Sequence, residues 1–122
     1  MSDITRLRSS EKLSRIVKYN GVVYLCGQVD EHYNDHVDAI KAQTSATLAR
    51  IDEHLAAAGT NKTRLLYATV YVKDVALVPE VNAIWNSWLM DCVPPARSCV
   101  QAQMANPNIL VEITVQAAES FN

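Results

Sequence analysis

The sequence predicts an α+β fold, one mixed β-sheet with two helices packed on one face, on the strength of three observations. The Asn20-Gly21 dipeptide joins two short β-branched runs, which is the strongest short signal for a β-hairpin. Two stretches, about 36–58 and 79–89, repeat apolar residues every three or four positions, as amphipathic helices do. Between them, residues 65–72 alternate in character with the period of two of a strand. Strands and helices in this order favour the α+β class.

Composition restricts the kind of protein further. The chain has 122 residues, of which 49% are hydrophobic, so one domain spanning residues 1–122 is expected. The net charge is −2 and no Lys/Arg cluster occurs, which argues against a nucleic-acid partner. No apolar run could span a bilayer and no signal-peptide core opens the chain, so a cytoplasmic protein without a membrane partner is expected. Its three cysteines are expected to be reduced thiols.

The first half of the chain should form three strands and the longer helix. Residues 4–8 predict a short edge strand, and residues 16–19 and 22–26 predict the two strands of the hairpin. The long helix is predicted over 36–58, and Gly59 stands where a left-handed C-terminal cap is wanted. Its apolar stripe comprises Val37, Ile40, Thr44, Leu48, Ile51, Leu55 and Ala58.

A central strand and a second helix follow. Residues 65–72 predict the strand, and Pro79 suits the first turn of a helix because its missing N–H is not needed there. Pro94-Pro95 ends that helix. The spacing of Trp85 and Trp88 assigns both to the core. The predicted buried stripe of this helix comprises Val81, Ile84, Trp85, Trp88 and Leu89.

The stretch 95–115 predicts a second hairpin and a candidate site. Two β-rich limbs flank a break at Asn106-Pro107-Asn108. If the connecting loop has an even number of residues, the period of two places Arg97, Cys99 and Glu112 on one polar face. A guanidinium and a carboxylate on such a face indicate a site for a small acid.

The same face is too polar for a core and too rich in tyrosine for an ordinary solvated surface. Aromatic residues and arginine are enriched in subunit interfaces, so the sequence predicts a site shared between subunits. The residues predicted on this face are Tyr67, Thr69, Tyr71, Arg97, Gln101, Glu112 and Thr114.

Six short motifs, in order along residues 16–118, carry a resemblance to a known family. They are Cys26-Gly27-Gln28, Ala57-Ala58-Gly59, Thr69-Val70-Tyr71-Val72-Lys73-Asp74, Val81-Asn82-Ala83, Pro95-Ala96-Arg97-Ser98-Cys99-Val100 and Val111-Glu112-Ile113. Together they resemble the reactive intermediate deaminase (Rid, YjgF-like) family, in a divergent bacterial branch. The match departs from the family's archetype at Cys26, where the archetype has Ser, and at Leu13, where it has Tyr.

The resemblance implies a chorismate-mutase-like subunit, a homotrimer and clefts between subunits. It also implies hydrolysis of enamine/imine intermediates such as 2-aminoacrylate to a 2-keto acid and ammonia, without metal or organic cofactor. Arg97 would clamp the substrate carboxylate, and Glu112 would position or activate water. The backbone at Cys99 would hydrogen-bond the substrate, while Asn82 and Cys26 would line the cleft.

Alternatives remain open for the site. Glu112 could be only the salt-bridge partner of Arg97, and the chain could be a non-catalytic trimer that binds small carboxylates. RNA cleavage, also attached to this family, is disfavoured by the acidic balance of charge. His32 and His36 could be metal ligands, but without a third ligand at suitable spacing they are expected to be solvated.

Overall fold

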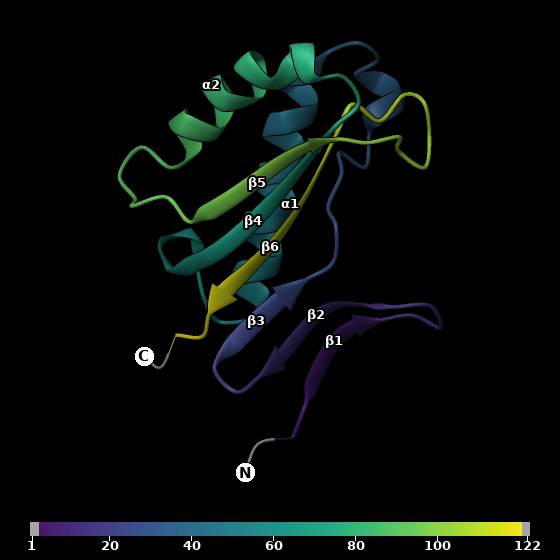
Figure 1. The fold of residues 1–122 in the computed structure, drawn as a ribbon. Coiled ribbons are helices and arrows are strands. Elements are labelled where there is room, and N and C mark those ends of the chain that lie inside the picture. Colours follow the sequence, from purple (N-terminus) through teal and green to yellow (C-terminus); the bar gives the residue numbers. More distant parts are fainter. Residues whose placement is uncertain (1–2, 121–122) are drawn as a thin grey trace.

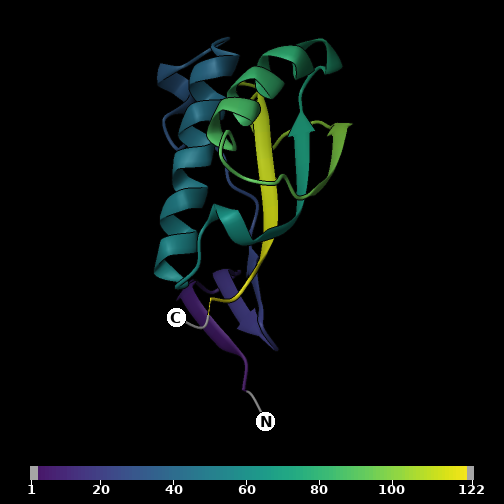
Figure 2. The ribbon, with the colours of Figure 1, turned by 90° about the vertical axis from the view of Figure 1, so that its left-hand side faces the viewer.

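The computed structural model describes residues 3–120 as a six-stranded sheet with both α-helices on one of its faces (Figures 1 and 2). The strand order is β1-β2-β3-β6-β4-β5; β4 and β5 are parallel and all other neighbours are antiparallel. The mixed sheet with two helices confirms the predicted architecture. No helix among the described residues is long and apolar enough to cross a membrane. The elements are β1 (Thr5–Ser9), β2 (Ser14–Tyr19), β3 (Val22–Leu25), α1 (Ile40–Ala57), β4 (Leu65–Val72), α2 (Val78–Trp88), β5 (Ala96–Gln101) and β6 (Val111–Ala118).

The predicted N-terminal hairpin is confirmed. Strands β2 and β3 pair antiparallel up to Tyr19 and Val22, so Asn20 and Gly21 form a two-residue turn. Both have positive φ, 50° and 81°, which is the backbone conformation that favours Asn-Gly in such turns. Strand β1 pairs with β2 at the sheet edge, as expected.

Helix α1 begins later than predicted. The segment 33–35 forms a 3₁₀ turn, and the helix starts at Ile40. Two local features interrupt the helix: His36 Nδ1 contacts Asp30 Oδ2 at 2.5 Å, and Asp38 has a φ of 58°, outside the helical region. Val37 is therefore half exposed and lies outside the stripe to which it was assigned. At the other end Gly59 has a φ of 83°, which confirms the predicted cap.

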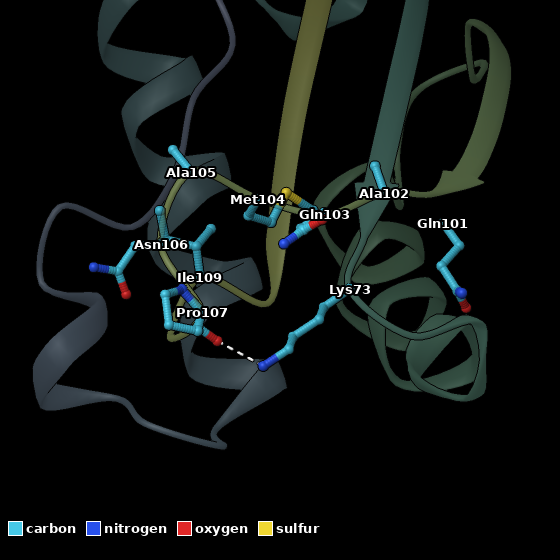
Figure 3. Close-up of a pocket in the computed structure, with 9 residues that line it drawn as sticks. All are labelled: Lys73, Gln101, Ala102, Gln103, Met104, Ala105, Asn106, Pro107 and Ile109. Atoms are coloured by element: carbon cyan, nitrogen blue, oxygen red, sulfur yellow. Dashed lines mark hydrogen bonds between the residues drawn. The ribbon is translucent and has the colours of Figure 1, made fainter.

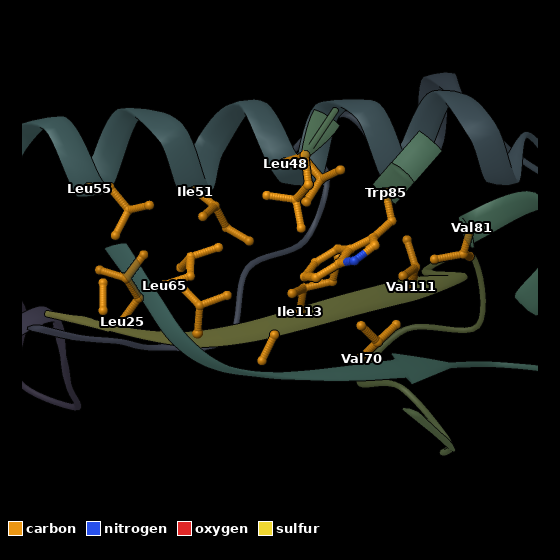
Figure 4. Close-up of a cluster of buried hydrophobic side chains, with 14 of the residues drawn as sticks. Leu25, Leu48, Ile51, Leu55, Leu65, Val70, Val81, Trp85, Val111 and Ile113 are labelled. Carbon is orange, nitrogen blue, oxygen red and sulfur yellow. The ribbon is translucent and has the colours of Figure 1, made fainter. Parts of the chain in front are cut away.

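The core lies between the helices and the sheet (Figure 4). Leu48, Ile51 and Leu55 of α1 point onto the sheet, as the predicted stripe requires. In β4 the predicted alternation holds from Ala68 onward but is reversed at the start. Leu65 is buried and Leu66 is exposed, because the pairing of β4 with β6 shifts register between Leu65 and Tyr67.

Helix α2 confirms the prediction for the second helical stretch. Pro79 lies in the first turn, and Val81 and Trp85 are buried, whereas Ile84 and Trp88 of the predicted stripe are only partly buried against the core. The rings of Trp85 and Trp88 pack at 5.5 Å, and Trp88 Nε1 donates to Asp52 Oδ2 of α1 at 2.9 Å. This bond joins the two helices.

The predicted second hairpin is wrong. Strands β5 and β6 do not pair with each other, because β4 lies between them. Helix α2 connects β4 to a parallel β5, which takes the outer position, and β6 returns antiparallel between β3 and β4. The alternation of residues is correct for each limb; the partner assigned to each limb is not.

Candidate functional site

Arg97 and Glu112 lie on opposite sides of the sheet. Arg97 pairs with Ala68, whose side chain is buried beneath the helices, whereas Glu112 pairs with Tyr71, which faces away from them. The prediction that Arg97, Cys99 and Glu112 share a face is therefore wrong. The reason is the intervening β4, which sets the phase of β5 and β6 independently of the loop between them.

One group of side chains gathers around Arg97. Its Nη2 donates to Asn82 Oδ1 of α2 at 2.8 Å, and its Cζ lies 5.4 Å from the ring of Trp85. Its Nη1 is buried and, within residues 3–120, has no hydrogen-bond partner. Cys99 lies two residues further along the edge strand on the same side and is exposed. The structure thus brings Arg97, Asn82 and Cys99 together.

A second group gathers around Glu112 on the other side of the sheet. Burial raises the pKa of the Glu112 carboxyl above its usual value of 4.5. A Cβ at Gly27 would overlap Glu112 Oε2, so the carboxylate rests against the glycine backbone. The segment of Gly27 is fixed beside β6 by Gln28, whose N donates to Ile113 O at 2.9 Å and whose O accepts from Ile113 N at 3.0 Å.

Cys26 adjoins this second group only in sequence, because its side chain contacts Gln28 and it does not line the pocket beside Glu112. It ends the hairpin, is partly buried, and its Sγ lies 3.3 Å from Nε2 of the buried Gln28. Gly27, between them, is the residue that meets the Glu112 carboxylate. Leu13 is exposed in the β1–β2 connection.

A shallow pocket of about 270 Å³ opens beside Glu112 on the face away from the helices. Its lining comprises Tyr71, Ala102, Gln103, Met104, Glu112 and Thr114.

We call the side of β4, β5 and β6 that the helices do not cover the open face (Figure 2). The open face holds most of the residues predicted for the polar face. Arg97 and Gln101 are the exceptions, because they lie on the helix side. Ser98 also belongs to the open face, where its Oγ is hydrogen-bonded to Tyr67 Oη. The use of the open face as a subunit interface stays a prediction.

A larger cavity, of about 530 Å³, lies at the loop between β5 and β6 (Figure 3). Lys73 Nζ donates to Pro107 O across it at 2.7 Å. Ala102 to Met104 form a wall common to this cavity and the Glu112 pocket. Neither Arg97 nor Glu112 lines it, so the predicted chemistry lies elsewhere. The lining comprises Lys73, Gln101, Ala102, Gln103, Met104, Ala105, Asn106, Pro107 and Ile109.

Two residues of these groups were not identified as site residues from sequence. Trp85 was assigned only to the core, although its spacing of three from Asn82 places both on one helix face. Gly27 entered the prediction only as part of the Cys26-Gly27-Gln28 motif. Its position next to Cys26 was the available signal, but its contact with Glu112 depends on the pairing of Gln28 with Ile113, 85 positions along the chain.

His32 and His36, both expected to be solvated, differ in their surroundings. His36 contacts the buried Asp30 carboxylate, whereas His32 is exposed beside Glu31. Asp30 also accepts from the backbone N of His32 at 2.8 Å. This arrangement fixes the loop before α1.

Comparisons with known proteins agree over nearly the whole chain. A family model described as endoribonuclease L-PSP matches residues 3–119. A RutC family protein of Haemophilus ducreyi is 39% identical over 115 residues, which cover 94% of this chain and 96% of that protein. The crystal structure of a YjgF family member from Neisseria meningitidis is 34% identical, with a TM-score of 0.91 and 98% of each chain covered. The Rid family protein YyfA of Yersinia pestis is 30% identical, with a TM-score of 0.82 and 90% of each chain covered.

Proposed function

Because this chain belongs to the endoribonuclease L-PSP family, which includes the YjgF and Rid proteins, we propose that it hydrolyses reactive 2-imino acids to 2-keto acids and ammonia. The sites would lie between the subunits of a homotrimer. The observation that supports this proposal is the separation of the Arg97 group from the Glu112 group on opposite sides of one sheet.

Each group supplies half of what the reaction needs. Arg97 offers a guanidinium that can bind a substrate carboxylate, and within residues 3–120 it forms no salt bridge. Glu112 offers a base and likewise has no salt-bridge partner among the described residues. Since β5 is an edge strand, a second copy whose open face met that edge would bring its Glu112 toward Arg97. Homo-oligomers with closed symmetry repeat such a contact at every interface.

The chemistry follows from the two groups. Arg97 holds the substrate carboxylate by charge-assisted hydrogen bonds and so fixes the position of C2. Glu112 takes a proton from water as the water oxygen bonds to the imine carbon. Glu112 returns this proton to the imine nitrogen, which gives a carbinolamine. The hydroxyl proton of the carbinolamine then passes to the amino group through Glu112, so that the C–N bond breaks, ammonia leaves and the C=O bond of the 2-keto acid forms. The raised pKa of Glu112 makes it a better proton acceptor than an exposed carboxylate.

The alternative function, a non-catalytic trimer that binds small carboxylates, would need only the Arg97 group. The burial of Glu112 against Gly27, with its raised pKa, favours the enzyme, because a carboxylate without a role gains nothing from desolvation. A net charge of −2 disfavours RNA as the substrate.

Mixing two inactive variants tests the shared site. Arg97→Leu and Glu112→Gln proteins are co-expressed with different tags, mixed trimers are isolated, and ammonia release from freshly generated 2-aminoacrylate is measured. Neither variant alone should be active. In each isolated mixed trimer, about one interface in three should combine both native residues and regain activity.

Two outcomes would contradict the proposal. Mixed trimers that form but stay inactive would mean that one chain supplies both groups. If wild-type protein binds 2-oxobutanoate but releases no ammonia from any imino acid, the enzyme is excluded and the alternative function, a non-catalytic carboxylate-binding trimer, is favoured. Glu80→Gln, which removes an exposed carboxylate on α2, is the control for a change of charge alone.

A further inference from the structure

The position of the Arg97 guanidinium is set by helix α2 rather than by the strand that carries it. Asn82 and Trp85 lie one helical turn apart, so both side chains leave the same face of α2. Asn82 Oδ1 accepts from Nη2 at 2.8 Å, and the Trp85 ring lies 5.4 Å from Cζ. This distance is within the range of a cation–π interaction, for which tryptophan is the best aromatic partner.

These two contacts compensate for an unfavourable feature. Nη1 is buried and has no acceptor within residues 3–120, and a buried charged donor without a partner is costly. A solvated rotamer would satisfy Nη1 with water, but it would give up the Trp85 ring and the Asn82 amide. The observed conformation therefore depends on α2. It also leaves Nη1 available, so that a ligand oxygen reaching it would gain a hydrogen bond without displacing another.

We propose that Trp85 is a positioning residue, whose indole face holds the Arg97 guanidinium in the orientation that binds a planar carboxylate. The identity of the ligand, a substrate carboxylate, rests on the proposed function. The positioning of Arg97 by Trp85 does not depend on it. A ring that fixes the plane of the guanidinium lowers the entropy lost when two parallel hydrogen bonds form. Trp85 then affects affinity through Arg97 and need not touch the substrate.

Trp88 provides a matched control on the same helix. It packs against Trp85 at 5.5 Å, but its polar contacts go elsewhere: Nε1 donates to Asp52, and Lys62 Nζ lies 5.4 Å from its ring. Replacing Trp88, which is partly buried against the same core, removes a tryptophan from α2 without removing the ring beside Arg97.

The test compares Trp85→Leu, Trp85→Phe and Trp88→Leu with the wild type. Calorimetric titration with 2-oxobutanoate should show affinity reduced roughly three- to thirtyfold in Trp85→Leu, the range expected for a lost cation–π contact. Trp85→Phe should recover most of this loss, and Trp88→Leu should bind like wild type. In deaminase assays, Trp85→Leu should raise KM and leave kcat unchanged, because the lost interaction is made equally in the ground and transition states.

A second measurement needs no ligand. In the NMR spectrum of the free protein, the Arg97 Nε–Hε signal should be displaced by the ring current of Trp85 and return toward that of free arginine in Trp85→Leu, but not in Trp88→Leu. An undisplaced signal in the wild type, or equal affinity losses in Trp85→Leu and Trp88→Leu, would overturn the inference. Wild-type protein that fails to bind any 2-keto acid would refute the proposed function alone, since the Arg97 signal would still test the positioning.

Discussion

The carboxylate of Glu112 rests directly on the backbone of Gly27. A Cβ at position 27 would overlap Oε2 and come within 3.3 Å of Cγ, so the side chain can occupy this place only because the residue is glycine. The contact joins β6 to the segment that follows β3, and Gln28 fixes it by two backbone hydrogen bonds to Ile113. Gly27 therefore sets both the position and the burial of Glu112.

Gly27→Ala should displace the Glu112 carboxylate and slow deamination. A misplacement of about 1 Å of a catalytic group costs on the order of a hundredfold in rate, so kcat should fall by about that factor while affinity for a 2-keto acid, bound by Arg97, changes little. Steady-state kinetics and calorimetry on one preparation check both parts. Unchanged kcat would show that Glu112 need not occupy the observed position.

The stability of the fold should depend on the protonation of Glu112. Burial raises the pKa of this carboxyl in the folded state, so the folded chain binds the proton more tightly than the unfolded chain. The contribution of the protonated Glu112 carboxyl to stability is complete below the pKa that this group has in the unfolded chain. It is lost as the pH rises through the higher pKa of the folded chain. Urea unfolding should therefore show Glu112→Gln gaining stability relative to wild type as pH rises above the usual carboxyl pKa of 4.5. Glu80→Gln, at an exposed position, should show no such gain.

His54 should make the opposite contribution. It is buried on α1, its Nδ1 lies 2.8 Å from Arg8 Nη1, and desolvation, then the charges of Arg8 and Arg50, lower its pKa below 6.5. The unfolded chain then binds this proton more tightly, so stability should fall as pH decreases from about 6.5 through the lower folded pKa. Glu53 opposes the shift and Arg15 adds to it.

His54→Gln keeps an acceptor for Arg8 but cannot titrate, so its free energy of unfolding should lose this dependence on pH. Chemical denaturation between pH 4 and pH 7.5, about the interval in which histidine titrates, checks the prediction. His32→Gln removes an exposed histidine and is the control. An equally steep fall with acidification in His54→Gln would mean that other groups cause it.

Gln43 should contribute strongly to stability. Its side chain is fully buried on α1, where Nε2 donates to His36 O and Asn108 O and Oε1 accepts from Leu110 N. Gln43→Ala would take the side-chain partner from Asn108 O and Leu110 N, while His36 O keeps its bond from Ala39 N. Each unpaired group costs about 1–3 kcal/mol, so the free energy of unfolding should fall by several kcal/mol. Gln103→Ala, at an exposed position, should have little effect. Denaturant midpoints of both variants measure the difference.

The sequence alone predicted the features that depend on neighbouring residues. The Asn20-Gly21 turn, the Gly59 cap and the Pro79 start of α2 follow from the backbone preferences of those residues. The alternation along β4, β5 and β6 follows from strand geometry. The motifs around Arg97 and Glu112 also indicated the family, and the family model that matches residues 3–119 confirms it.

The tertiary structure alone decided which strands are neighbours, and with them the faces of the candidate site. Periodicity places alternate residues on two sides of a strand, but it contains no information on the partner of that strand. The crossover through α2 placed β5 outside β4, and this placed Arg97 against Asn82 and Trp85, on the side away from Glu112. The start of α1 was likewise set by the contact between Asp30 and His36 and by the backbone of Asp38. Pairing between distant segments depends on the packing of the whole sheet, which no local pattern encodes.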